Sequence, residues 1–149
     1  FHNHLCMAYF WVYLSAMRRK GFFFGVMFAS IIAVNPALAQ KNEVVDQIKE
    51  AIKAGSAKEL SKHLNQTIDV TIDGKLQNYS KAQAEFVLRD FFKAHPPSDF
   101  NIIHQGSSKG GQPFAIGEYI SGSDKYRVWM KIKTANKDQL IQEISFVKQ

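Results

Sequence analysis

The sequence predicts an α+β domain in which a few helices pack on one face of a mainly antiparallel sheet. Two observations lead to this fold class. Helical stretches with clear start and stop signals occupy the first part of the domain, and strand-like runs separated by short turns occupy the rest. Residues 40–149 are long enough to bury one hydrophobic core, so we expect a single domain over this range.

The first expected helix ends at a glycine. Val45, Ile48 and Ile52 recur at helical spacing, and Gly55 is a natural stop. The next four residues, Ser56-Ala57-Lys58-Glu59, have the pattern of a capping box, in which the serine and the glutamate bond to free backbone amides. A short second helix should therefore begin there.

A hairpin and a longer helix follow. Thr67–Ile72 alternates apolar and polar residues, and Asp73-Gly74 is a strong signal for a tight hairpin turn. Ser80-Lys81-Ala82-Gln83 is a second capping-box pattern and should start the most clearly marked helix of the chain. Pro96-Pro97 ends that helix, because proline cannot continue it.

The remaining residues read as four antiparallel strands joined in sequence. The expected strands are Phe100–Ser107, Phe114–Ser121, Lys125–Lys133 and Gln139–Val147. The expected turns are Gly110-Gly111, Gly122-Ser123 and Asn136-Lys137.

Five segments carry a resemblance to known proteins: Ile48–Leu64, Tyr79–Pro97, His104–Lys109, Ala115–Tyr119 and Tyr126–Trp129. In these the chain resembles a family of small secreted proteins from Gram-negative bacteria, described as a domain of unknown function. The order of elements resembles the cone-shaped nuclear-transport-factor-2-like (cystatin-like) fold, in which helices cover a curved sheet. The resemblance spans nearly all of residues 40–149 and implies fold and compartment. It implies no catalytic residues.

The beginning of the chain has the features of a secretory leader. Residues 17–39 contain a basic start at Arg18, Arg19 and Lys20, an apolar run, and Ala37-Leu38-Ala39, which is an Ala-x-Ala cleavage signal. We therefore expect a signal peptide at 17–39, and an exported protein that is periplasmic or secreted. No permanent membrane anchor should remain after cleavage. An uncleaved N-terminal anchor is the alternative.

Residues 1–16 fit neither a leader nor a domain. They read as sequence from upstream of the true start, or from a miscalled start, and we leave them out of the fold.

Charge and cysteine content argue against several classes of protein. The formal net charge is +6, but Arg18, Arg19 and Lys20 supply three of the 19 basic residues and all 13 acidic residues come later. The later charges are interspersed without a basic stripe, which argues against nucleic-acid binding. The single cysteine, Cys6, lies outside the domain.

Cofactor and metal signatures are also missing from the sequence. The domain histidines, His63, His95 and His104, show no ligand spacing, and no nucleophile elbow or phosphate-binding glycine loop occurs. We therefore expect no cofactor and no metal.

Two-residue turns would fix which side chains share a face of the sheet. With that register, the helices cover one face and leave the other rich in large apolar groups. Such an uncovered face should be an interface, and cone-type folds often dimerise through it, so we expect a homodimer. Glu118 and Arg127 lie opposite one another there. The alternative is that sheet curvature or a terminal segment hides this face. The expected dimer face contains Phe114, Ile116, Trp129, Ile144, Phe146, Glu118 and Arg127.

The same register places His104 and Ser145 in one row on the covered face, near Tyr119 and Tyr126. An aromatic pocket with a histidine and a hydroxyl could hold a small apolar ligand. Glu143 is expected on this face too, and Asp69 is an acid candidate by type. The alternative is a histidine satisfied near the core.

Three functions remain open at this point. The first is an exported, non-enzymatic binding or interaction module of unknown ligand that forms a homodimer. The second is a cone-type enzyme acting by acid–base chemistry at His104, Asp69 or Glu143 on a small hydrophobic substrate. The third is a purely structural domain that acts through its sheet face.

Overall fold

The computed structural model describes residues 36–149 of the chain. The segment 1–16 and the leader up to residue 35 lie outside the described residues. The proposed cleavage point between Ala39 and Gln40 falls within the first described helix. Among residues 36–149, no helix is long and apolar enough to span a membrane.

Helix α2 spans Pro36–Lys53 and ends as the glycine predicts, since Gly55 adopts a φ of +65°. Helix α3 spans Ala57–Ser61. The Ser56 hydroxyl accepts a hydrogen bond of 3.2 Å from the Glu59 amide, which is the first half of the predicted capping box. The Glu59 carboxylate instead accepts a hydrogen bond of 2.7 Å from Lys62 Nζ, so only half of the box forms.

Strands β1 (Leu64–Ile72) and β2 (Lys75–Ser80) form the predicted hairpin, and Asp73 and Gly74 both have positive φ angles in its turn. Helix α4 (Lys81–Ala94) begins with both halves of the second capping box. It ends just before the two prolines, as expected.

Four more strands complete one six-stranded sheet: β3 (Asp99–Ser107), β4 (Pro113–Ser121), β5 (Asp124–Ala135) and β6 (Asp138–Lys148). The order across the sheet is β2-β1-β6-β5-β4-β3. All neighbours are antiparallel except β1 and β6, which run parallel. The α+β prediction is therefore confirmed, and the sheet is mixed.

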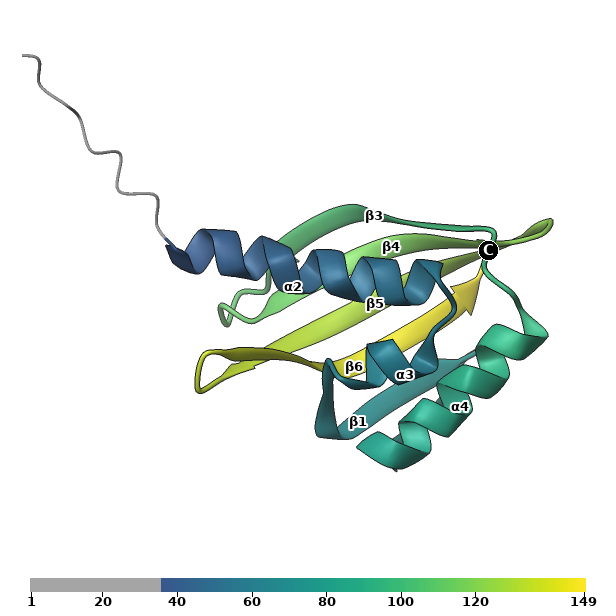
Figure 1. The fold of residues 1–149 in the computed structure, drawn as a ribbon, viewed down its shortest axis with the longest axis horizontal. Helices are drawn as coiled ribbons and strands as arrows, with labels where there is room; N and C mark the ends of the chain where they lie inside the picture. The colour runs from purple at the N-terminus through teal and green to yellow at the C-terminus, as the bar shows by residue number, and fades with distance from the viewer. Residues whose placement is uncertain (1–35) are drawn as a thin grey trace, which may run out of the picture. The chain divides into compact units, whose positions relative to one another are not determined.

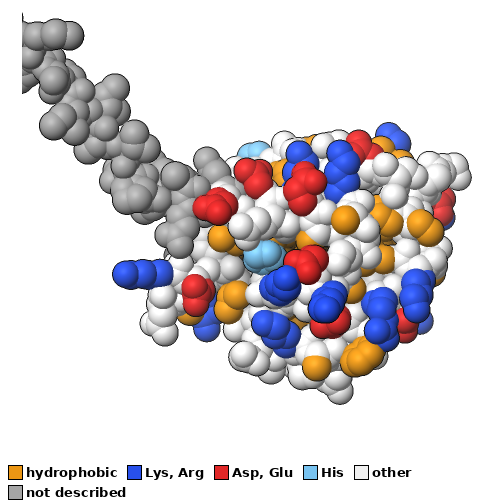
Figure 2. Space-filling model, viewed as in Figure 1, with side chains coloured by type: hydrophobic (Ala, Val, Ile, Leu, Met, Phe, Trp, Pro, Cys, Tyr) orange, Lys and Arg blue, Asp and Glu red, His pale blue; other side chains and the backbone are white. Residues whose placement is uncertain are grey.

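The helices lie on one side of the sheet (Figure 1). Their buried side chains meet those of the strands in one core, to which α2 contributes Ile48 and Ile52 and α4 contributes Leu88 and Phe91. From the helix side, charged groups of both signs are interspersed over the surface (Figure 2). The opposite side of the sheet, which we call the open face, carries no described helix.

The pairing of β3 with β4 differs from the prediction. The turn between them is longer than two residues, because Ser107 pairs with Pro113 and the Ser108 amide donates 2.9 Å to the Gln112 carbonyl. His104 therefore lies opposite Ile116 and not opposite Gly117. A bulge between Ile102 and His104 then shifts the register by one more residue. Ile102 therefore pairs with Gly117, and both lie on the helix-covered face, as expected for these two residues.

A second bulge changes the face of half of β6. Ile132 pairs with Ile141 as predicted, but Lys131 pairs with Glu143, so Gln142 is an extra residue. Every side chain beyond Gln142 consequently lies on the opposite face from the one expected. The pairing of β4 with β5 was predicted correctly, including Glu118 opposite Arg127.

Candidate functional site

The space under the helices is filled by aromatic side chains. The Phe91 ring lies 4.5 Å from the Phe146 ring and 5.8 Å from that of Tyr119, measured between centroids. Met130 and Tyr119 are fully buried. Phe100 occupies the room above Gly117. These groups form a packed core.

Tyr119 and Tyr126, both expected in a pocket, belong to this core. Burial raises the pKa of each phenol. The Tyr119 hydroxyl donates to the His95 carbonyl at the end of α4. The Tyr126 hydroxyl lies 3.1 Å from His95 Nδ1. The two phenols therefore hold the end of α4 against the sheet.

The other four expected pocket residues lie on the open face. His104 and Ser145 are paired there with Ile116 and Trp129, so their predicted place under the helices was wrong. The longer β3–β4 turn places His104 on the open face, and the bulge at Gln142 does the same for Ser145. Glu143 changes face for the same reason as Ser145, and it pairs with Asp69 of β1. The six residues therefore do not form one site.

Two residues expected on the dimer face are core residues. Ile144 and Phe146 have no exposed surface. Ile144 pairs with Met130 and Phe146 with Val128, both of which point under the helices. Their placement on the uncovered face was wrong, because the bulge inverts the alternation of β6.

The remaining expected residues do gather on the open face. One row across the sheet runs through Ser145, Trp129, Ile116 and His104. The large apolar groups in it are partly exposed.

The neighbouring row on the open face combines charged groups with an aromatic ring. It runs through Asp69, Glu143, Lys131 and Phe114. The Phe114 ring lies 5.6 Å from that of His104, between centroids. Asp69 Oδ1 accepts a hydrogen bond of 2.7 Å from Asn78 Nδ2. Phe114 thus joins Trp129 and Ile116 of the first row in an apolar strip, which lies beside the charged groups Asp69, Glu143 and Lys131.

Glu118 and Arg127 lie opposite each other on this face but form their contacts elsewhere. Glu118 Oε1 lies 3.8 Å from Lys125 Nζ. With the amide oxygen of Gln149 turned towards it, Arg127 donates from Nε and Nη2 over 3.0 and 3.1 Å. Both charged groups stay at the surface and remain accessible to a partner.

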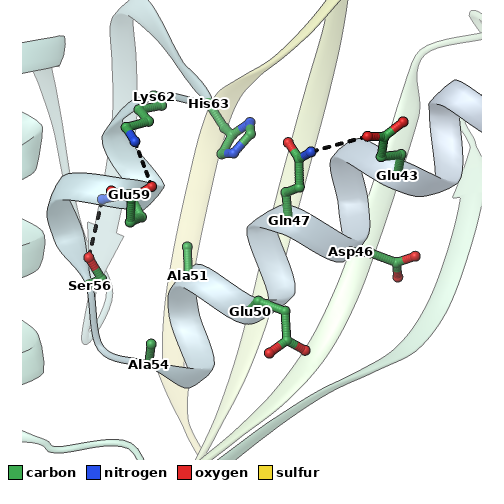
Figure 3. A pocket seen from close by; sticks show the side chains of 10 residues that line it. All are labelled: Glu43, Asp46, Gln47, Glu50, Ala51, Ala54, Ser56, Glu59, Lys62 and His63. Atoms are coloured by element: carbon green, nitrogen blue, oxygen red, sulfur yellow. Dashed lines mark hydrogen bonds and ion pairs between the residues drawn. The ribbon is translucent and has the colours of Figure 1, made fainter.

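A groove between α2 and α3 was not identified from the sequence. It encloses about 770 Å³, and Figure 3 shows Glu43 and Gln47 on the side of His63, with Asp46 and Glu50 turned away from it. Burial lowers the pKa of His63. In the sequence, the acidic residues that recur at helical spacing along α2 could have indicated this groove.

The acidic side chains of this groove do not converge on one point (Figure 3). Within residues 36–149, no three His, Cys, Asp or Glu side chains are close enough together to hold a metal ion. The groove therefore offers an acidic surface without a ligand cage.

The comparisons with known proteins identify the family. The model of the family described as Domain of unknown function (DUF4783) matches residues 45–146. This chain belongs to the DUF4783 family. The match covers almost all of β1 to β6 together with α3, α4 and the second half of α2, so the fold above is that of the family domain. No protein with a curated description matches this chain.

Solved structures agree with the assignment to DUF4783. A family member from Bacteroides uniformis is 28% identical with a TM-score of 0.67, over 71% of this chain and 97% of that one. A Shewanella baltica NTF2-like protein of unknown function is 11% identical with a TM-score of 0.59, over 76% and 94%. A Nostoc punctiforme domain with a cystatin-like fold is 8% identical with a TM-score of 0.59, over 77% and 78%. The last two are similar in fold alone, and they match the predicted cone-type architecture.

Proposed function

We propose that this DUF4783 protein is an exported, non-enzymatic interaction module that forms a homodimer through the open face of its sheet. The observation that carries the proposal is the partly exposed strip of Trp129, Ile116 and Phe114, which no described helix covers. Apolar groups gathered on a surface are typical of interfaces, because burying them releases water.

The charges beside the strip favour a second copy as the partner. A two-fold axis places one surface against the same surface of the other chain, so a suitable patch must carry both signs of charge. The open face does so: Glu118 and Glu143 lie among Lys131 and Arg127. Each acid can therefore meet a base across the axis.

The dimensions of the sheet also suit a dimer. Six strands spaced about 4.8 Å apart, with lengths of 6 to 12 residues that average about nine and a rise of about 3.3 Å per residue, give a face of roughly 700 Å². Stable interfaces bury about 800 Å² on each partner.

Export rests on the leader-like residues 17–39. An enzyme is less well supported. General acid–base catalysis is most effective where water is excluded, whereas His104, Asp69 and Glu143 lie on the open side of the sheet and the interior is packed.

Replacing Trp129 by glutamate tests the proposal. The carboxylate would be buried unpaired at the centre of the interface, so we expect the mass measured by sedimentation velocity to fall from two chains to one. Phe86→Glu is the matched control, because Phe86 is an exposed aromatic on α4, 55% accessible, and its substitution should leave the dimer intact. Circular dichroism shows whether both variants are folded. A folded Trp129→Glu variant that stays dimeric, or a monomeric unsubstituted chain, contradicts the proposal.

A further inference from the structure

A hollow lies beside strand β2, at the margin of the hydrophobic core. It encloses about 270 Å³, and its lining comes from β1, β2, the turn between them and helix α4. Gln77 of β2 lines it and is paired with Val70 of β1, whose side chain is only 2% exposed in the core under the helices. Paired residues share a face, so the hollow lies on the helix-covered side of the sheet and not on the open face.

The inner wall of the hollow is apolar and aromatic. Val70 and Ile72 of β1, Val87 of α4 and the ring of Tyr79 supply this wall. Ile72, Tyr79 and Val87 pack against the core but stay partly exposed. An apolar body placed against them would be stabilised, because the contact releases water from both surfaces.

The rim of the hollow at the hairpin turn carries both signs of charge. Asp73 lies in the turn and Lys75 is the first residue of β2, and both are exposed. Among the side chains that the structure describes, neither belongs to an ion pair. Beside them the Tyr79 hydroxyl donates to Gln77 Oε1, which leaves the Gln77 Nε2 group as a donor. A negative group, a positive group and an amide donor therefore border one apolar wall.

We propose that this hollow binds a free α-amino acid with an apolar side chain. The ammonium group of the ligand contacts Asp73, and its carboxylate contacts Lys75 and Gln77. Its side chain lies against Val87 and Tyr79. The ammonium and the carboxylate of such a molecule are attached to one carbon atom, which suits two opposite charges that are close together at a tight turn.

The charges of the rim also select against simpler ligands. An apolar carboxylic acid would bring a second carboxylate to Asp73, and an apolar amine would bring a second ammonium to Lys75, both of which are unfavourable. The volume restricts the size of the ligand as well, because sites for drug-sized molecules enclose about 300–1,000 Å³ and this hollow is smaller. A dimer formed through the open face leaves the hollow accessible, so the inference does not rest on the proposed function.

Calorimetric titration of the protein with L-phenylalanine tests the proposal, and amide chemical shifts in isotope-labelled protein locate the binding. We expect saturable binding, with shifts concentrated at residues 72–79 and at Val87. Phenylpropionate lacks the amino group, phenethylamine lacks the carboxylate and glycine lacks the side chain. Each should bind about tenfold more weakly or worse, because each loses a charge-assisted hydrogen bond or the apolar contact. If any of the three binds as tightly as L-phenylalanine, or if the shifts lie elsewhere, the proposal is wrong.

Two substitutions remove the two charges separately. Asp73→Asn retains the turn, since asparagine also adopts the positive φ of 50° found there. It should weaken L-phenylalanine about tenfold and bring its affinity close to that of phenylpropionate. Lys75→Gln should weaken L-phenylalanine to a similar extent. Lys109→Gln is the matched control, because Lys109 is an exposed lysine between β3 and β4, and its substitution should leave the affinity unchanged.

The outcomes separate this inference from the proposed dimer face. Binding of L-phenylalanine should persist in the Trp129→Glu variant, since the hollow and the open face lie on opposite sides of the sheet. A folded Asp73→Asn or Lys75→Gln variant that binds L-phenylalanine as tightly as the unsubstituted protein overturns the inference, whatever the oligomeric state. So does an unsubstituted protein that does not bind L-phenylalanine.

Discussion

Gly117 permits a close contact in the core. A Cβ built at this position would lie 2.5 Å from Phe100 Cζ and 3.1 Å from the Asn101 carbonyl oxygen. Neither neighbour can withdraw easily, because Phe100 is fully buried and the other atom belongs to the backbone. The absent side chain is therefore what lets β3 pack its phenylalanine across β4.

Gly117→Ala should lower the free energy of unfolding by about 1–3 kcal/mol, the usual cost of overpacking a core. Urea denaturation measures the change. Gly110→Ala is the control, because nothing lies within 4 Å of a Cβ built there. Equal stabilities of the two variants would show that Phe100 can move aside.

The helices, strands and turns were predicted well. The face of the sheet on which each strand residue lies was predicted less well. Capping signals and turn residues act locally, which is why the helix starts at Ser56 and Ser80 and the turn at Asp73-Gly74 could be read from the sequence. A bulge is set by packing across the whole sheet, and one extra residue inverts the alternation beyond it.

A signal for the bulge in β6 was nevertheless present. Ile141 and Ile144 are three residues apart, a spacing that regular alternation forbids for two side chains on one face. That spacing could have placed Ile144 and Phe146 in the core. The shift of His104 gave no such signal, because it depends on the length of the turn between Ser107 and Pro113.

The cap at Ser80 should stabilise α4 measurably. Its hydroxyl accepts a hydrogen bond from the Gln83 amide over 3.3 Å, and the Gln83 side chain accepts one from the Ser80 amide over 3.0 Å. Ser80→Ala leaves that first amide without its partner, so we expect a loss of about 1 kcal/mol in thermal or urea unfolding. The exposed Ser108, mutated to alanine, is the control. A loss no larger than that of the control would mean that water replaces the cap.

At the scale of the whole molecule, the packed interior directs attention to the outer surfaces. Phe91, Tyr119 and Met130 occupy the space in which a cone-type protein could hold a ligand, while the apolar strip around Trp129 stays partly exposed. The sequence predicted this strip, because its core, Phe114, Ile116 and Trp129, lies on strands whose mutual register was correct.

The fluorescence of Trp129 tests the dimer face most directly. The chain has two tryptophans, so Trp11→Phe leaves Trp129 as the sole emitter. A second copy on the open face would shield its indole, and quenching by acrylamide should therefore weaken as protein concentration rises and the mass approaches two chains. Quenching that stays constant while the mass doubles would place the dimer interface elsewhere and contradict the account.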